Sequence, residues 1–203
     1  MLKFSRMLDH GAPMPTFALP GTDGKIWSNS DVHGENGTVV AFICNHCPFV
    51  LHVIDTFVEV ANTYREKGIG FVAISSNDPA EHPEDSFDKM GTFAEDHGFR
   101  FPYLYDESQD VALAFNAICT PDFFVFDRHQ KLFYTGQFDA SRPNTGHPPL
   151  PGAPKLRTDL PVTGEDLRGA LDALLEGKPA PEDAKPSAGC SIKWRPGKQP
   201  KWG

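Results

Sequence analysis

The sequence predicts an α/β protein in which a central mixed sheet is flanked by helices. Three observations support this prediction: two short apolar runs rich in β-branched residues, helical periodicity after each run, and a later hairpin with strong alternation. The first run, 38–43, reads Thr-Val-Val-Ala-Phe-Ile, and the second, 70–75, reads Gly-Phe-Val-Ala-Ile-Ser. Such runs are typical of strands that are buried on both faces of a sheet.

A short β-hairpin is expected before the first run. Residues 13–20 read as an edge segment that is broken by prolines, and Asp23-Gly24 is a turn signal. Residues 25–28 then supply the return strand. We therefore expect an N-terminal hairpin that precedes the central sheet.

The remaining elements alternate between helix and strand. Residues 48–67 carry apolar side chains at spacings of three and four, which indicates a helix, and Gly68 is its expected C-cap. The later elements are a helix at 85–97, a strand at 101–105, a short helix at 110–116, a hairpin of strands 123–126 and 131–136, and a helix between Thr163 and Gly177.

This order, a β-α-β core followed by a β-β-α unit, is the plan of the thioredoxin fold, which we therefore predict. One domain is expected over 1–177, with a proline-rich insertion at 139–162. Residues 178–203 are rich in Pro, Gly and Lys and predict an extended C-terminal tail without regular structure. The apolar and aromatic cluster at 189–194 suggests that this tail docks on the domain.

Composition limits the class of protein. The chain has 203 residues and a formal net charge of −8, which argues against general binding of nucleic acid or anionic membranes. The first residues lack the apolar core of a signal peptide, and no stretch is long and apolar enough to span a membrane. We therefore expect a cytoplasmic protein. Four cysteines are too few for a secreted disulfide scaffold, and in a reducing compartment a close pair is catalytic or metal-binding.

Two cysteines follow the first apolar run directly, in the sequence Cys44-Asn45-His46-Cys47 at the predicted helix start. Cysteines three positions apart at a helix start lie on one face, which suits a disulfide. The free N–H groups of the helix start stabilise a thiolate, so we expect Cys44 to attack and Cys47 to resolve. An imidazolium at His46 would lower the pKa of Cys44 further.

Two other interpretations of this motif stay open. In the first, Cys44 and Cys47 are simply small buried hydrophobes, as free cysteines often are. In the second, Cys44, His46 and Cys47 bind a metal ion, although there is no second Cys-x-x-Cys to complete the ligand set. The succession of strand, Cys-x-x-Cys and helix favours the redox interpretation, which requires no cofactor and no metal.

A second signal is Cys119-Thr120-Pro121, which lies just before the strand at 123–126. In the thioredoxin plan this position holds a cis-proline whose loop faces the cysteine pair, so we predict a cis Thr120–Pro121 bond. We expect the loop to bind the extended chain of a partner. Cys119 is then either a third redox thiol or a packed side chain. Cys190 in the tail is either a resolving thiol or a surface thiol on an anchored segment.

These residues resemble the thioredoxin-like redoxins known as peroxiredoxin-like, AhpC/TSA-related proteins with a Cys-Asn-His-Cys motif. The matching segments are 13–17, 23–25, 44–50, 119–122 and 189–194. The resemblance implies a thioredoxin fold with Cys44 at the position of the peroxidatic cysteine. Typical peroxiredoxins carry Pro-x-x-x-Thr-x-x-Cys, and here the corresponding residues are Ala41 and Gly37 when counted from Cys44. Counted from Cys47, they are Cys44 and Val40.

The predicted function is that of a thiol–disulfide oxidoreductase, an antioxidant enzyme of cell redox homeostasis, with thiol peroxidase activity as a further candidate. Its partners would be protein or small-molecule disulfides or peroxides, and a reducing thiol of the thioredoxin or glutathione type. The alternative is a metal-binding or redox-sensing thioredoxin-like module that uses Cys44, His46 and Cys47. Metal content after purification without added metal separates the two.

Overall fold

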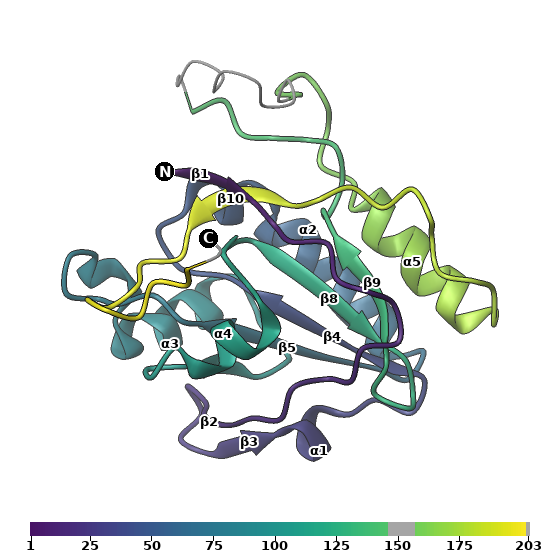
Figure 1. The fold of residues 1–203 in the computed structure, drawn as a ribbon, viewed down its shortest axis with the longest axis horizontal. Coiled ribbons are helices and arrows are strands. Elements are labelled where there is room, and N and C mark those ends of the chain that lie inside the picture. Colours follow the sequence, from purple (N-terminus) through teal and green to yellow (C-terminus); the bar gives the residue numbers. More distant parts are fainter. Residues whose placement is uncertain (146–156, 202–203) are drawn as a thin grey trace.

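The computed structural model describes residues 1–145 and 157–201, and its centre is a five-stranded mixed sheet (Figure 1). The strand order is β6-β5-β4-β8-β9, in which β4, β5 and β6 are parallel and β8 and β9 are antiparallel to their neighbours. The strands are β4 (Gly37–Phe42), β5 (Ile69–Ser75), β6 (Tyr103–Tyr105), β8 (Asp122–Phe126) and β9 (Leu132–Gly136). This is the mixed sheet that the sequence predicts.

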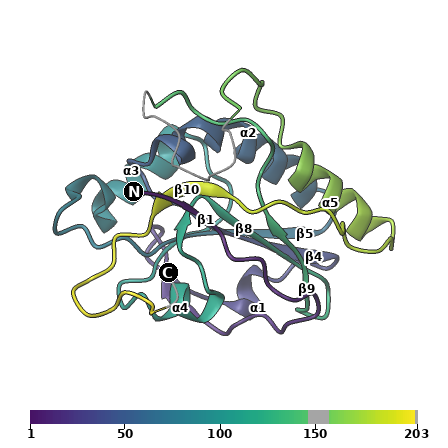
Figure 2. The same ribbon diagram turned by 45° about the horizontal axis from the view of Figure 1, so that its top comes forward.

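Helices cover both faces of the sheet, as Figure 2 shows. One face packs against α2 (Pro48–Arg65), α3 (Phe87–Asp96) and α5 (Glu165–Leu175). The other face packs against α1 (Asn29–Val32), α4 (Asp110–Phe115) and the predicted hairpin of β2 (Ala18–Pro20) and β3 (Ile26–Ser28). The prediction of a helix-flanked sheet with an N-terminal hairpin is confirmed.

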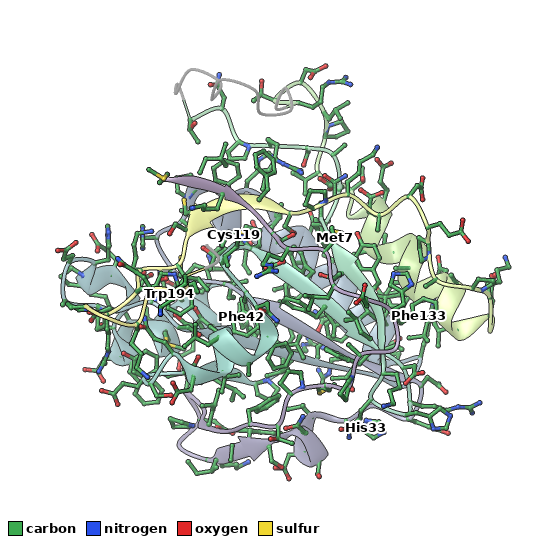
Figure 3. The ribbon with its side chains drawn as sticks, viewed as in Figure 1. Met7, His33, Phe42, Cys119, Phe133 and Trp194 are labelled. Atoms are coloured by element: carbon green, nitrogen blue, oxygen red, sulfur yellow. The ribbon has the colours of Figure 1, made fainter. Side chains whose placement is uncertain are left out.

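The central position of β4 in the sheet explains why almost all of its side chains are apolar. Successive side chains of a strand point to opposite faces. Val39 and Ala41 therefore enter the core beneath α2, whereas Val40 and Phe42 enter the core on the α4 face (Figure 3). Every residue of β4 is buried, and the hydroxyl of Thr38 is satisfied there because its Oγ1 accepts the backbone N–H of Gly34.

Helix α2 begins and ends where local chemistry dictates. Pro48 occupies its first turn, where the missing N–H has no intrahelical partner to lose. Apolar side chains form the buried stripe along its length. After Arg65 the chain turns at Gly68, whose φ of 80° lies in the left-handed region that glycine adopts readily. The helix start thus places Cys47, its N-cap residue, at the carboxyl end of the β-sheet.

The C-terminal segment corrects one prediction. Residues expected to lack regular structure include β10 (Ala188–Ser191), which lies between β1 (Leu2–Phe4) and β7 (Cys119–Thr120) in a three-stranded antiparallel sheet. Figures 1 and 2 both show β1 and β10 side by side across the end of the domain. The sequence Ala-Gly-Cys-Ser has no alternation and little β-propensity, so pairing on both sides imposes the strand. β1 was likewise not predicted.

The proline-rich insertion at 139–162 lies partly outside the described residues, which omit 146–156. Its two ends are held together, because Oδ2 of Asp139 accepts the backbone N–H groups of Thr163 and Gly164, each at 2.7 Å. Helix α5 therefore begins beside Asp139. None of the described helices is long and apolar enough to cross a membrane.

Candidate active site

The structure brings the predicted cysteine pair together with the predicted proline loop. Cys44 follows β4, and Cys47 is the N-cap residue of α2. Sγ of Cys44 lies 3.3 Å from Oγ1 of Thr120, and the Cys47 thiol donates to the Thr120 carbonyl oxygen at 3.2 Å. The Thr120–Pro121 bond is cis, as predicted. Both cysteines are free thiols, and both have 0% of their surface exposed.

The helix start acts on Cys47. Burial works against a charged sulfur, but the Cys190 and Cys44 thiols lower the pKa of the Cys47 thiol. Because α2 begins at Pro48, its free N–H groups lie beside the N-cap residue. The thiolate at this helix start is therefore favoured on Cys47.

Cys44 has the opposite environment. Burial, the neighbouring Cys47 and the negative charge of Asp85 raise the pKa of the Cys44 thiol well above its ordinary value, and only the Thr120 hydroxyl opposes them. These effects disfavour a thiolate on Cys44 and so do not support the expectation that Cys44 gains most from the helix start, which remains a prediction.

A buried carboxylate that the sequence analysis missed organises this loop. Asp85 has 0% exposure and ends the short 3₁₀ turn η1 (Pro83–Asp85). Its Oδ1 accepts the backbone N–H groups of Asn45 at 2.9 Å and His46 at 3.3 Å. Its Oδ2 accepts the Asn77 amide at 2.7 Å and lies 2.6 Å from Nδ1 of His46. Asp85 thus fixes the Cys-Asn-His-Cys loop against the loop that follows β5.

His46 is therefore paired with Asp85 and does not act on Cys44 as an isolated charge. The hydrogen bond to Asp85 raises the pKa of His46, and its ring stacks on that of His82 with centroids 4.4 Å apart. Conversely, although burial opposes it, hydrogen bonds from His46 and Asn77 lower the pKa of Asp85. The polar loop after β5 was the sequence feature that could have indicated Asp85. Sequence spacing alone, however, does not show which acidic residue of that loop is buried.

The same residues bear on the metal-binding alternative. Ligand atoms of Cys44, His46 and Asp85 lie within 4.8 Å of one another, and Cys47 is not part of this group. Both Asp85 oxygens already accept two hydrogen bonds each from protein groups. A metal ion would have to displace some of these donors, so the carboxylate is better suited to holding the loop.

The two other cysteines differ sharply in their surroundings. Cys119 lies in β7 next to β10 (Figure 3), and burial raises the pKa of its thiol well above the ordinary value. Cys190 lies opposite Thr120 in the β10–β7 pair and packs against the buried cluster that contains Cys47, while part of its surface is exposed. The prediction that the tail docks on the domain is confirmed for this segment, and its docking place is the cysteine pair. Redox roles for Cys119 and Cys190 remain predictions.

The sequence pattern of the AhpC/TSA family matches residues 10–135, more than half of the chain. The chain belongs to the AhpC/TSA family. A Mycobacterium tuberculosis protein whose name marks it as a candidate peroxiredoxin is 28% identical over 174 residues, which cover 80% of this chain and 100% of that protein. This AhpC/TSA protein is therefore a thioredoxin-like redoxin, as the resemblance implies.

Solved structures support the same placement of this AhpC/TSA protein. An uncharacterized conserved protein from Geobacillus kaustophilus is 52% identical, with a TM-score of 0.87 and 97% of each chain covered. A hypothetical protein from Sinorhizobium meliloti 1021 is 39% identical, with a TM-score of 0.85 over 96% of this chain and 99% of that one. Peroxidoxin BcpB from Mycobacterium tuberculosis, 19% identical with a TM-score of 0.58 over 84% and 98%, shares the fold.

Proposed function

We propose that this redoxin is a thiol–disulfide oxidoreductase whose redox centre is the pair Cys44 and Cys47. The observation that carries the proposal is that both sulfurs contact one residue, Thr120, in the cis-proline loop. Two thiols on a common anchor at a strand-to-helix junction are placed to form a disulfide and to exchange it. The membership of the chain in a redoxin family supports this chemistry.

We assign the attacking thiolate to Cys47 and the second thiol to Cys44, which reverses the roles expected from the sequence. Cys47 as a thiolate attacks one sulfur of a substrate disulfide, forming a mixed disulfide and releasing the other substrate sulfur as a thiolate. Cys44, once deprotonated, attacks Sγ of Cys47 and expels the second substrate thiolate. The released thiolates take up the protons, and the pair ends as the Cys44–Cys47 disulfide. The Cys190 thiol, which lowers the pKa of Cys47, supports the Cys47 thiolate in this sequence.

Disulfides fit the site better than peroxides as substrates. In typical peroxiredoxins a threonine lies three residues before the reactive cysteine and a proline lies seven before it. Here those positions hold Cys44 and Val40 when counted from Cys47. An external thiol of the thioredoxin or glutathione type would regenerate the reduced pair, and a reducing compartment such as the cytoplasm supplies it. Thiol peroxidase activity is the further candidate, and a metal-binding or redox-sensing module remains the alternative.

Disulfide mapping tests the proposal. The protein is equilibrated in glutathione redox buffers, quenched with acid, alkylated and analysed by mass spectrometry. We expect a Cys44–Cys47 disulfide that appears cooperatively, together with catalysed reduction of a small-molecule disulfide. Cys47→Ser should abolish turnover. Failure to form this disulfide, or stoichiometric metal in protein purified without added metal, would refute the redox assignment.

A further inference from the structure

The edge of β7, at which a partner strand would pair, is already occupied by another strand of the same chain. β10 pairs antiparallel with β7, with Cys190 opposite Thr120 and Ser191 opposite Cys119. The approach is so close that a Cβ at Gly189 would lie 2.0 Å from the Thr120 carbonyl oxygen. The other edge of β10 is paired with β1. A second extended chain therefore cannot occupy this edge of β7 while β10 is present.

β10 also presents a cysteine at the position where a bound substrate strand would present one. Cys190 packs against the buried cluster that contains Cys47, and its thiol and backbone N–H both lower the pKa of Cys47. Cys44 and Cys47 are wholly covered, whereas Cys190 is partly exposed. Among the described residues, Cys190 is thus the thiol that contacts both the buried pair and solvent.

In addition to the strand pairing, side-chain hydrogen bonds just after β10 hold this segment in position. The backbone N–H of Lys193 donates to Oδ1 of Asn77 at 2.9 Å, and the Gln109 amide donates to the Lys193 carbonyl oxygen at 2.8 Å. Asn77 in turn donates to Asp85, which holds the cysteine loop. One hydrogen-bond chain therefore sets both the strand that carries Cys190 and the loop that carries the pair.

We propose that β10 is a built-in substrate strand and that Cys190 exchanges disulfides with Cys47, relaying electrons from an external dithiol to the buried pair. This relay rests on the proposed function of Cys44 and Cys47. It implies that a small, soluble dithiol or a protein with an accessible dithiol is the reductant, and that it acts at Cys190.

The relay consists of three thiol–disulfide exchanges. In the first, the Cys190 thiolate attacks Sγ of Cys47, the Cys44–Cys47 bond breaks, and Cys44 leaves and takes up a proton. In the second, a thiolate of the external dithiol attacks Sγ of Cys190 and expels Cys47 as the thiolate. The other thiol of the reductant then closes its own disulfide and frees Cys190. The pair gains two electrons, and the dithiol loses two.

The electrostatic surroundings of Cys190 change in the direction that this relay needs. In the reduced protein the hydrogen bond to Cys47 is the main cause that raises the pKa of Cys190, whereas Lys193 lowers it. When Cys47 is held in a disulfide, it carries no negative charge to accept that proton. The effect of Lys193 persists, so oxidation of the pair favours the thiolate of Cys190.

Two cysteine variants test the relay directly. In Cys44→Ser, one equivalent of diamide should produce an intramolecular Cys47–Cys190 disulfide, because Cys44 is no longer present to reclaim Cys47. In Cys190→Ser, the Cys44–Cys47 disulfide should still form. Dithiothreitol should reduce it at a rate that is lower than in the wild type by a factor of about ten or more. An unchanged reduction rate in Cys190→Ser, or no Cys47–Cys190 disulfide in Cys44→Ser, would overturn the relay. Absence of the Cys44–Cys47 disulfide in the wild type would instead overturn the proposed function.

A glycine variant separates the relay from a structural effect of the cysteine change. Gly189→Ala places a Cβ against the Thr120 carbonyl and should displace β10, while Gly169→Ala in α5 meets nothing within 4 Å and is the matched control. Added to Cys190→Ser, Gly189→Ala should restore direct reduction of the pair by dithiothreitol, and Gly169→Ala should not. Equal rates for the two double variants would show that β10 does not control access to the pair.

Discussion

Nδ1 of His46 lies 2.6 Å from Oδ2 of Asp85, and this contact joins the cysteine loop to the turn that follows β5. Asp85 is fully buried, and the His46 side chain is 21% exposed. The two groups therefore act as an ion pair that is largely shielded from solvent, with a charge-assisted hydrogen bond. Its strength depends on the protonation of His46, which makes the loop sensitive to pH.

The His46–Asp85 pair predicts a pH-dependent stability. Its hydrogen bond to Asp85 raises the pKa of His46 above the ordinary 6.5, Cys47 assists, and burial and Lys193 oppose. A raised folded-state pKa stabilises the protein below pH 6.5, and this contribution is lost as the pH rises through the folded-state pKa. His46→Gln should therefore lower the free energy of unfolding by about 1 kcal/mol more in acid than in alkali. Urea titrations at both pH values check this, with His129→Gln, an exposed turn residue, as control.

The electrostatics of the pair predict which sulfur is charged. Cys44→Ser should retain a thiolate near neutral pH on Cys47, because the Cys190 thiol still lowers the pKa of that sulfur. Cys47→Ser should show no thiolate until strongly alkaline pH, because burial and Asp85 disfavour charge on Cys44. Ultraviolet thiolate absorbance during a pH titration measures both. Equal titration curves for the two variants would contradict the assignment.

Core packing along α2 predicts an asymmetry between two similar side chains. Ile54 is 1% exposed beneath the sheet, whereas Leu51 is 49% exposed on the same helix. Ile54→Ala should lower the free energy of unfolding by about 2–5 kcal/mol, because it leaves a cavity. Leu51→Ala should change it by about 0.5 kcal/mol or less. Chemical denaturation of both variants measures the difference, and equal losses would show that the helix is rotated from this placement.

Asp139 predicts how the insertion and α5 are held. Its Oδ1 accepts the Ser141 hydroxyl at 2.6 Å, and its Oδ2 accepts two backbone N–H groups before α5. Asp139→Ala leaves these donors without their acceptor, so it should cost about 2–3 kcal/mol of unfolding free energy. Asp96→Ala, an exposed change in α3, is the control. Faster amide exchange at the start of α5 is the local readout, and unchanged exchange would refute this role.

Most of the fold followed from the sequence because each central element is encoded locally. β4 is buried on both sides, and its side chains are therefore apolar except for Thr38. α2 has both an apolar stripe and a terminating Gly68. β10 was not predicted, for the opposite reason. Its residues take their conformation from β1 and β7, which are distant in sequence, and no local pattern records such pairing.

The candidate site was likewise predicted from the sequence only in part. Cys44, Cys47 and the Thr120–Pro121 loop were found from motif and order, and the structure places them in contact. Asp85 was missed because its role depends on a turn that folds back onto the cysteine loop. The electrostatic difference between the two cysteines depends on Asp85 and Cys190, which are distant from both cysteines in the sequence.

The place of β10 in the chain has a consequence for protein synthesis. A ribosome makes β4, α2 and the cis-proline loop first, and β10 emerges only after β8, β9 and α5. Folding during translation proceeds from the N-terminal side, so the sheet can form around the cysteine pair before its cover exists. During that interval the nascent chain carries two thiols that β10 does not yet cover. Pairing of β10 with β1 and β7 then completes the burial of Cys44 and Cys47.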